Sequence, residues 1–515
     1  MIKSCTVRRR FYTAEAAGAA ITVDLEPGFG TPKACLIMYT ESSANTNAFD
    51  TTLAVRNLGI GIVGPADSTV SSTLIYRSVT GVMADNSSPS SVRRANSNTR
   101  YMGASDLAGA VFWQFTTASF STDRATFTPP ASTPQTNGHL DTIMTFFTGT
   151  GLSVGIGNTS FATTAGGTRD FSGLAWIPDV VIVASTITAL NASGTDDFRF
   201  CFGCATRSPL KQKGIYMHQE NSATPANVDI GTLSSSNTIV TYSTSNAVGP
   251  YTHTISNIVR GGWTMTSSDA AGGSNNNYIY LAMSTETPTD FALVDILSNT
   301  STGVQFTGLG SSGFVPKTIL GAVTNCPTDN TRETTSPNAD AISLFSGNRT
   351  NDDLYWNGTG TIQTNSAGTA VTGVGTEFFR LAPGDKIYQT NNTLIGTVSG
   401  VTSKTAMTLT GNAAATLPAG TAFVYSNPGQ YSLFYGNTDN SNPSYVFSGI
   451  AGTLIAISNG QASSANFGDL AILSDFDTRN GYELNHTKVT GTARRGWALA
   501  IKGDQQARRH EDPYS

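Results

Sequence analysis

Charged residues are scarce in this chain. Asp, Glu, Lys and Arg make up 13% of its 515 residues, and the formal net charge is −5; ordinary globular proteins carry about 25% charged residues. Such a chain has no basic field with which to bind nucleic acid. It also lacks any apolar run of the ~18 residues that a membrane-spanning helix needs. We therefore expect no nucleic-acid partner and no insertion into a membrane.

Residues that bind metals or form disulfides are few and scattered. The five cysteines are an odd number, and Cys201 and Cys204 form a C-x-x-C pair without a second pair or nearby histidines. The five histidines lack the i,i+4 spacing of a transition-metal site. Asp475 and Asp477 or the loop 437–442 could supply oxygen ligands for calcium, but no twelve-residue pattern supports such a site. We predict no metal site and no cofactor, with calcium as an unsupported alternative.

Two sequence motifs of enzymes occur by coincidence. Residues 151–155 match G-x-S-x-G and residues 59–64 match G-x-G-x-x-G. Both motifs require a helix directly after the glycines, and neither segment is followed by a helical pattern. The pairs of neighbouring aspartates lie among Asn, Gly and Thr, where Asp is usually a turn residue. We predict no catalytic residues and a protein that is not an enzyme.

Glycine, serine, threonine and asparagine are abundant, which favours short strands joined by tight turns. One strand pattern recurs three times: an aromatic residue and a proline precede a short apolar run at 29–38, 176–184 and 313–324. The copies are about one domain length apart. Residues 280–283 and 497–501 also resemble each other as closing strands. The sequence therefore predicts a threefold internal duplication.

The predicted fold is all-β, with three tandem antiparallel β-sandwiches of jelly-roll-like type and a small β-domain inserted in the third. The boundaries are 1–147 for the first sandwich, 148–297 for the second, 298–357 and 427–503 for the third, 358–426 for the inserted domain and 504–515 for a charged tail. Two interpretations of the tail stay open, a frayed terminus and a segment that docks on a neighbouring chain.

The N-terminal segment resembles a secretion signal only superficially. Arg8, Arg9 and Arg10 are reminiscent of a twin-arginine motif, but Glu15 occupies the place of an apolar core. We interpret the segment as the first strand of the first sandwich, and we expect synthesis in the cytoplasm.

Exposed aromatic side chains could stack on sugars. Tyr355, Trp356 and Tyr435 are the candidates for glycan contact. The competing interpretation is that they are core residues, as most aromatics of a sandwich are.

The repeated Pro-strand and the segment 492–502 resemble β-rich structural proteins of tailed-bacteriophage virions, and residues 373–378 and 381–388 resemble a small β-module of phage surface proteins. This resemblance implies a non-enzymatic virion protein on the tail, baseplate or fibre, or a head decoration. It would be present in many copies that contact one another and other virion proteins. The alternative is a receptor-binding adhesin or carbohydrate-binding module for host surface glycans. A polysaccharide depolymerase is weaker still, because the expected short solenoid repeats are missing.

Overall fold

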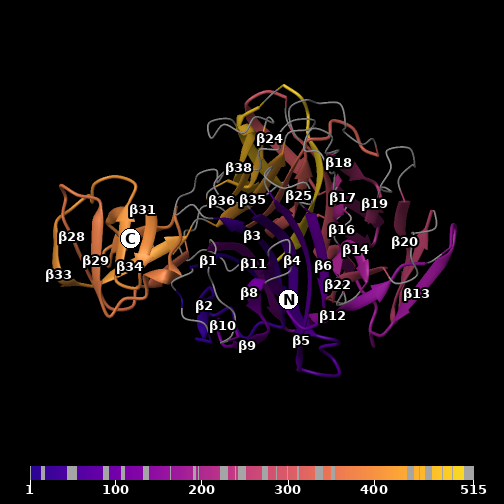
Figure 1. Cartoon of the computed structure of the whole chain (residues 1–515), viewed down its shortest axis with the longest axis horizontal. Helices are drawn as coiled ribbons and strands as arrows, with labels where there is room; N and C mark the ends of the chain where they lie inside the picture. The colour runs from indigo at the N-terminus through magenta and orange to yellow at the C-terminus, as the bar shows by residue number, and fades with distance from the viewer. Residues whose placement is uncertain are drawn as a thin grey trace.

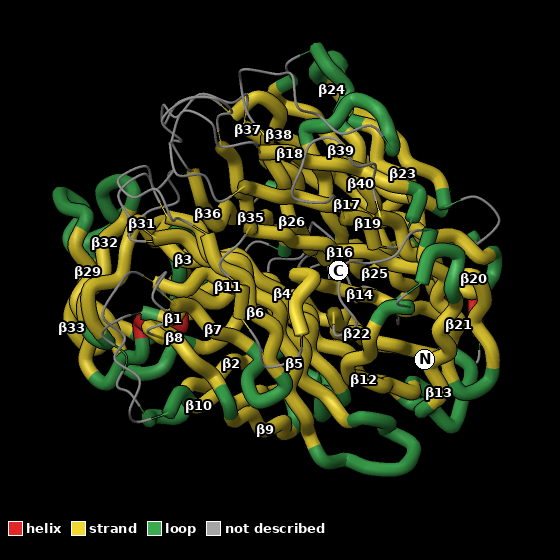
Figure 2. Tube along the Cα trace, turned by 45° about the vertical axis from the view of Figure 1, so that its right-hand side comes forward, coloured by secondary structure: helices red, strands yellow, loops and turns green. Residues whose placement is uncertain are grey.

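Antiparallel strands form nearly all the regular structure in the computed structural model of the chain (Figure 2). Among the described residues there is no α-helix, and no helix that could cross a membrane. The predicted all-β class is thus confirmed. The structure describes residues 2–503 apart from 13–14, 16–17, 43–54, 85–91, 106–110, 131–138, 163, 190–192, 195–196, 221–229, 238, 242–250, 269–275, 286, 299, 310–312, 331–339, 349–353, 428, 438–445, 452, 459–466, 478–479 and 490.

The first sandwich begins with the arginine-containing segment, which is a strand as predicted. Its large sheet has the order β1 (Ile2–Phe11), β11 (His139–Gly149), β3 (Ala34–Ser42), β4 (Val55–Pro65), β5 (Leu74–Ala84) and β6 (Val92–Ser97). The small sheet has the order β2 (Ile21–Asp24), β10 (Arg124–Thr128) and β9 (Thr117–Ser121), and a separate pair consists of β7 (Met102–Ser105) and β8 (Val111–Phe115).

The second sandwich has a six-stranded and a four-stranded sheet. The large sheet has the order β12 (Ser153–Ser160), β22 (Asn276–Ser284), β14 (Val180–Ala189), β16 (Asp197–Arg207), β17 (Leu210–Glu220) and β18 (Ile230–Ser235). The small sheet has the order β13 (Thr168–Ser172), β21 (Gly262–Ser267), β20 (Tyr251–Val259) and β19 (Ile239–Thr241). The short β15 (Ser193–Gly194) leaves this sandwich and pairs with β6 of the first.

The third sandwich repeats the strand order of the second. Its large sheet has the order β23 (Phe291–Leu297), β40 (Arg495–Lys502), β25 (Pro316–Thr324), β26 (Asp340–Asn348), β35 (Gln430–Asn437) and β36 (Val446–Ala451). The small sheet has the order β24 (Gly303–Gly308), β39 (Gly481–Lys488), β38 (Phe467–Asp477) and β37 (Ile455–Ser458). The 3-10 turn η2 (Pro288–Asp290) precedes β23.

The three recurring proline segments occupy equivalent places. The strands β3, β14 and β25 are each third in a large sheet, next to the last strand of their own sandwich. The similar segments 280–283 and 497–501 lie in β22 and β40, which are each second. A threefold duplication would produce this order. The domain boundaries stay predictions, and each sandwich has more strands than the eight of a jelly roll.

Both faces of each large sheet are buried. In β14, Val180, Ile182 and Ala184 belong to one hydrophobic core, whereas Val181 and Val183 belong to another. Successive side chains of a strand point to opposite faces, so the strand separates the two cores. The strands β3 and β25 divide their side chains in the same way. The sequences of these strands are therefore continuous apolar runs, without alternating polar residues.

One of these cores is shared by all three sandwiches. It takes side chains from all three large sheets, while each sandwich also has a core of its own. Trp497 in β40 lies in the shared core, with its ring 5.0 Å from that of Phe202 in β16. Contacts run from β4 and β5 to β12, from β16 and β17 to β23, and from β35 and β36 to β3. The sandwiches therefore close into a ring, which the sequence did not predict.

The inserted domain is an eight-stranded sheet with its own core. It lies between β26 and β35 in the chain and extends away from the ring (Figure 1). Its elements are β27 (Leu354–Asn357), β28 (Thr361–Thr364), β29 (Ala370–Val374), the 3-10 turn η4 (Phe378–Arg380), β30 (Lys386–Gln389), β31 (Leu394–Ser403), β32 (Ala406–Leu409), β33 (Leu417–Thr421) and β34 (Phe423–Asn427).

Candidate functional site

The three aromatic residues predicted to bind glycans do not form one exposed site. Tyr435 is 0% exposed and belongs to the shared core, so its prediction as a surface residue is wrong. It is buried because both faces of the large sheet are covered, which a two-layer sandwich would not require. Tyr355 and Trp356 lie in β27, and their side chains are outside the described part of the structure.

The two enzyme-like motifs lie on strands. Residues 153–155 begin β12 and residues 59–64 lie within β4, so no helix follows either set of glycines. All five cysteines are described, all are buried, and none of them forms a disulfide. Cys201 and Cys204 point into different cores, because an odd spacing along a strand changes the face. Within the described ranges, no group of three or more His, Cys, Asp or Glu could hold a metal ion. Asp475 and Asp477 are in β38, with side chains that are not described. Of the candidate calcium loop 437–442, residue 437 ends β35 and residues 438–442 lie outside the described residues, as does the tail 504–515.

Buried charges concentrate where the inserted domain meets the first sandwich. Arg8, Arg9 and Arg10 on β1 are at most 3% exposed. Arg10 binds Asp141 of β11 through two hydrogen bonds of 2.7 Å, and Arg8 lies 3.5 Å from the same carboxylate. Arg9 pairs with Glu15. Burying three arginines without such partners would be prohibitively costly.

The same arginines hold the inserted domain. Arg8 donates to the carbonyl oxygen of Pro383, and Arg9 donates to that of Phe379. Tyr12 donates to the carbonyl oxygen of Leu381 at 2.8 Å and belongs to the core of the inserted domain. The first strand of the chain is thereby fixed to a domain more than 350 residues away.

The acids at this junction respond to burial in different ways. Burial favours a raised pKa for Asp141, but the charges of Arg10 and Arg8 outweigh it and lower the pKa. Burial raises the pKa of Glu15 despite the Arg9 charge beside it. Burial likewise raises the pKa of Asp385 to about 7, although the Arg8 charge opposes the shift. One oxygen of Asp385 accepts from the Ala382 amide at 2.7 Å. The junction therefore holds a carboxyl group that titrates near neutral pH.

A cleft of about 210 Å³ opens between the inserted domain and the first sandwich. Its cationic side chains are already paired with acids. Arg380 lies 2.6 Å from Asp24, and Lys404 lies 3.2 Å from Glu377. Each of the described cationic side chains that line the cleft therefore has an acidic partner.

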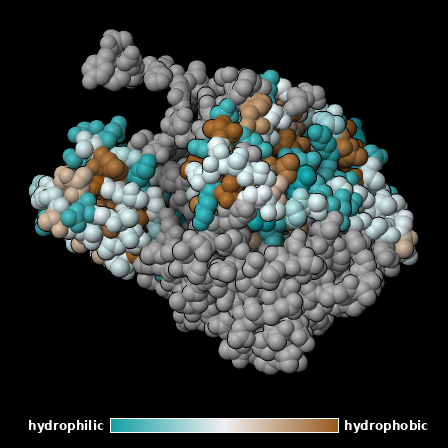
Figure 3. Space-filling view, turned by 90° about the horizontal axis from the view of Figure 1, so that it is seen from above, coloured by the Kyte–Doolittle hydropathy of each residue, from teal (hydrophilic) through white to brown (hydrophobic). Residues whose placement is uncertain are grey.

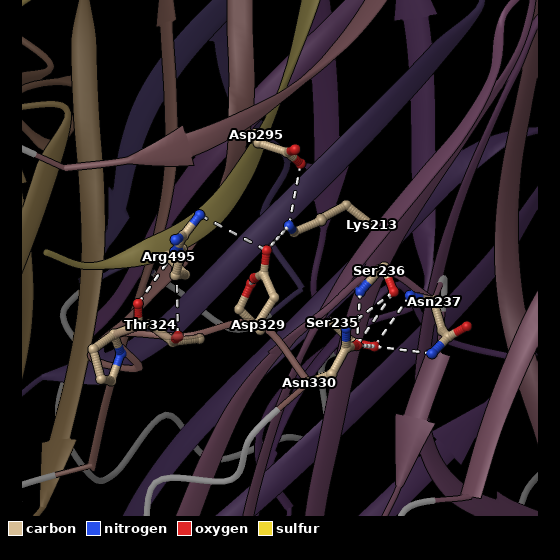
Figure 4. A network of polar contacts seen from close by, with 11 residues as sticks. Lys213, Ser235, Ser236, Asn237, Asp295, Thr324, Asp329, Asn330 and Arg495 are labelled. Atoms are coloured by element: carbon tan, nitrogen blue, oxygen red, sulfur yellow. Dashed lines mark hydrogen bonds and ion pairs between the residues drawn. The ribbon is translucent and has the colours of Figure 1, made fainter.

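Polar contacts also fix the second sandwich to the third. Lys213 on β17 lies 2.5 Å from Asp329 and 3.2 Å from Asp295 of β23 (Figure 4). Ser234 donates to Asp329 at 2.7 Å, and Ser235 donates to Asn330 at 2.9 Å. These contacts join β17 and β18 to β23 and to the segment that follows β25.

The other two junctions combine carboxylates with hydroxyl, amide and ammonium groups, and Lys317 of the third sandwich lies 3.1 Å from Glu26 of the first. Thr6 of the first sandwich lies 2.8 Å from Ser346 of the third, and both side chains are buried. In the loop between β4 and β5, Asp67 accepts from the amide of Ala175 at 2.8 Å and from the indole of Trp176 at 3.0 Å. The inserted domain occupies the corresponding place between the fourth and fifth strands of the third sandwich, so both connections reach the next sandwich in the ring.

Comparisons with known proteins gave no match to a family model, a curated protein or a solved structure. The junctions are the sites that sequence reasoning missed. Three consecutive arginines in a predicted strand were a usable signal, because a strand would bury at least one of them and so demand an acid.

Proposed function

We propose that this chain is a non-enzymatic structural protein of a tailed-phage virion, exposed on the tail or baseplate or as a head decoration, and assembled in multiple copies. The observation that carries the proposal is the ring of three sandwiches around one shared hydrophobic core. A single chain of this kind imitates a trimer and can present three similar faces to its neighbours.

The junctions support a mechanical role. The ion pairs Lys213–Asp329 and Lys317–Glu26 and the hydrogen-bonded hydroxyls of Thr6 and Ser346 join the sandwiches to one another. The inserted domain is held by the buried side chains of Arg8, Arg9 and Tyr12. The inserted domain extends away from the ring (Figure 1), which supports a role for it in contacts with other molecules. We expect its partners to be other copies of the chain and other virion proteins.

Quantitative mass spectrometry of purified virions tests this function. We expect the chain at a fixed integer ratio to the major head or tail protein, and we expect antibodies against it to label one region of intact particles. A virion role would be refuted if the chain occurs only in the lysate of infected cells and separates from the particles in a density gradient.

The alternative, a host-glycan adhesin, now depends on Tyr355 and Trp356, because Tyr435 is buried. A glycan array with wild type and Trp356→Ala separates the two functions. Saturable binding that the substitution removes would favour the adhesin, and no binding by either protein would favour the structural role.

A further inference from the structure

The edge strand β24 of the third sandwich carries exposed apolar side chains. Val304 is 59% exposed and Phe306 is 40% exposed. Both are on the outer face, because Gln305 between them lies 2.8 Å from the buried His486. In the described residues, β24 pairs with β39 on one side only. Among the described strands, none pairs with its other side, which we call an open edge.

The two equivalent edge strands are polar. In the second sandwich, β13 is exposed at Arg169 and at Asp170, which accepts a hydrogen bond of 2.6 Å from Thr264. In the first sandwich, β2 ends in Asp24, which binds Arg124 at 3.1 Å and the inserted domain's Arg380 at 2.6 Å. The three sandwiches share a strand order, so this difference is a property of the third sandwich alone.

Natural proteins protect open edges with charged residues, proline or a covering segment, because an unprotected edge pairs with another strand. The edge strand β13 has charges, and β2 has both a charge and the inserted domain against it. The strand β24 reads Gly-Val-Gln-Phe-Thr-Gly and has no charge and no proline. Leu297 at the end of β23 is 41% exposed, and its carbonyl oxygen accepts from Gln305 at 2.7 Å. We call Leu297, Val304 and Phe306 the apolar edge.

The apolar edge lies at the top of the molecule in Figure 1, where β24 is labelled. Figure 3 shows the molecule from above, with apolar residues scattered among polar ones on this side. We propose that the apolar edge pairs with the apolar edge of a second copy of this chain, antiparallel and about a twofold axis. This inference rests on the proposed function, since it names a contact through which copies would assemble.

A second copy is the occupant that the sequence of β24 fits best. Antiparallel pairing about a twofold axis places the same surface on both subunits. With the axis at Gln305, Val304 lies opposite Phe306 of the partner subunit, twice by symmetry, so each apolar side chain meets another. Directly opposed pairs of this kind contribute to sheet stability. Because β24 is uncharged, two copies would not repel each other.

Sedimentation of the purified full-length chain over a range of concentrations tests the pairing. We expect a reversible dimer of twice 53.9 kDa. Val304→Glu should abolish it, because two carboxylates would face the same interface. The matched control is Thr168→Glu on β13, which adds the same charge to the equivalent exposed strand and should leave the dimer unchanged. Equal unfolding temperatures of the variants would show that both fold.

A double variant, Val304→Cys with Phe306→Cys, tests the register. Directly opposed residues have Cβ atoms about 4.5–5.5 Å apart, so mild oxidation should give a covalent dimer. Thr168→Cys with Asp170→Cys should not crosslink. The inference would be overturned if the wild type stays monomeric and the double variant fails to crosslink. It would also be overturned if Val304→Glu leaves the dimer intact, or if a different virion protein is captured at this edge. Val304→Glu incorporated normally into virions would overturn the pairing while leaving the virion role in place. A chain that dimerises but is missing from virions would overturn only the virion role.

Discussion

Asp141 is predicted to be the most sensitive charge of the junction between the inserted domain and the first sandwich. It is fully buried and neutralises Arg10 through two hydrogen bonds of 2.7 Å, with Arg8 at 3.5 Å. Asp141→Asn removes the negative charge and leaves two guanidinium groups buried. Breaking a buried pair costs about 3–5 kcal/mol. Because Asn keeps one accepting oxygen, we expect a loss near the lower limit, about 3 kcal/mol.

Thermal unfolding at neutral pH measures this loss, with Asp170→Asn as the matched control. Asp170 is exposed on β13, where a substitution should change stability by no more than about 0.5 kcal/mol. In a unit of 150–250 residues, each kcal/mol shifts the transition by about 2–4 °C. Equal transition temperatures for the two variants would refute the reasoning.

The pH dependence of the wild type provides an independent check. The folded-state pKa of Asp141 is lowered, so its stabilisation is present above the ordinary pKa of about 3.9 and is lost as the pH falls through the folded value. Wild type should therefore lose stability in acid, and Asp141→Asn should lack this part of the loss. An acid dependence that is identical in the two proteins would exclude Asp141 as its source.

Three further predictions concern the insert junction and the buried groups. Burial raises the folded-state pKa of Asp385 to about 7, so its contribution to stability should fall as the pH rises from about 4 to about 7. The unfolding temperature of Asp385→Asn should lack this decline. The same pH dependence of the unfolding temperature in wild type and variant would contradict the prediction. Arg380→Ala should speed cleavage at the ends of the inserted domain in limited proteolysis, because it removes the 2.6 Å ion pair with Asp24. Lys404→Ala should leave the rate of cleavage unchanged, because the ion pair of Lys404 with Glu377 is exposed. The five buried cysteines should not react with a thiol reagent until the protein unfolds, since burial raises the pKa of Cys5 to about 12; rapid labelling of the native protein would refute their burial.

The strands were predictable because their patterns are local. An aromatic residue, a proline and a short apolar run indicated β3, β14 and β25, and all three are central strands of large sheets. The first strand was also predicted, against its resemblance to a signal sequence. The composition of residues 358–426 predicted an inserted domain, and a separate sheet extends from Leu354 to Asn427. The boundaries of this domain stay a prediction.

The arrangement of the sandwiches was not predictable in the same way. Continuous apolar runs showed that the strands are buried on both faces, but they do not show whether a second sheet or another sandwich covers each face. Tyr435 was misplaced for this reason. Asp141 lies 131 residues from Arg10 and Asp329 lies 116 residues from Lys213 along the chain, so no local pattern pairs them.

The shared core is tested most directly by hydrogen exchange on wild type and Trp497→Ala. Trp497 is 0% exposed, and its indole donates to the carbonyl oxygen of Phe202 in the second sandwich at 3.3 Å. Truncating a buried tryptophan costs about 3–5 kcal/mol. If the three sandwiches form one cooperative unit, exchange should become faster in β3, β14 and β25 together. Faster exchange confined to β25 and its neighbours in the third sandwich would contradict a shared core.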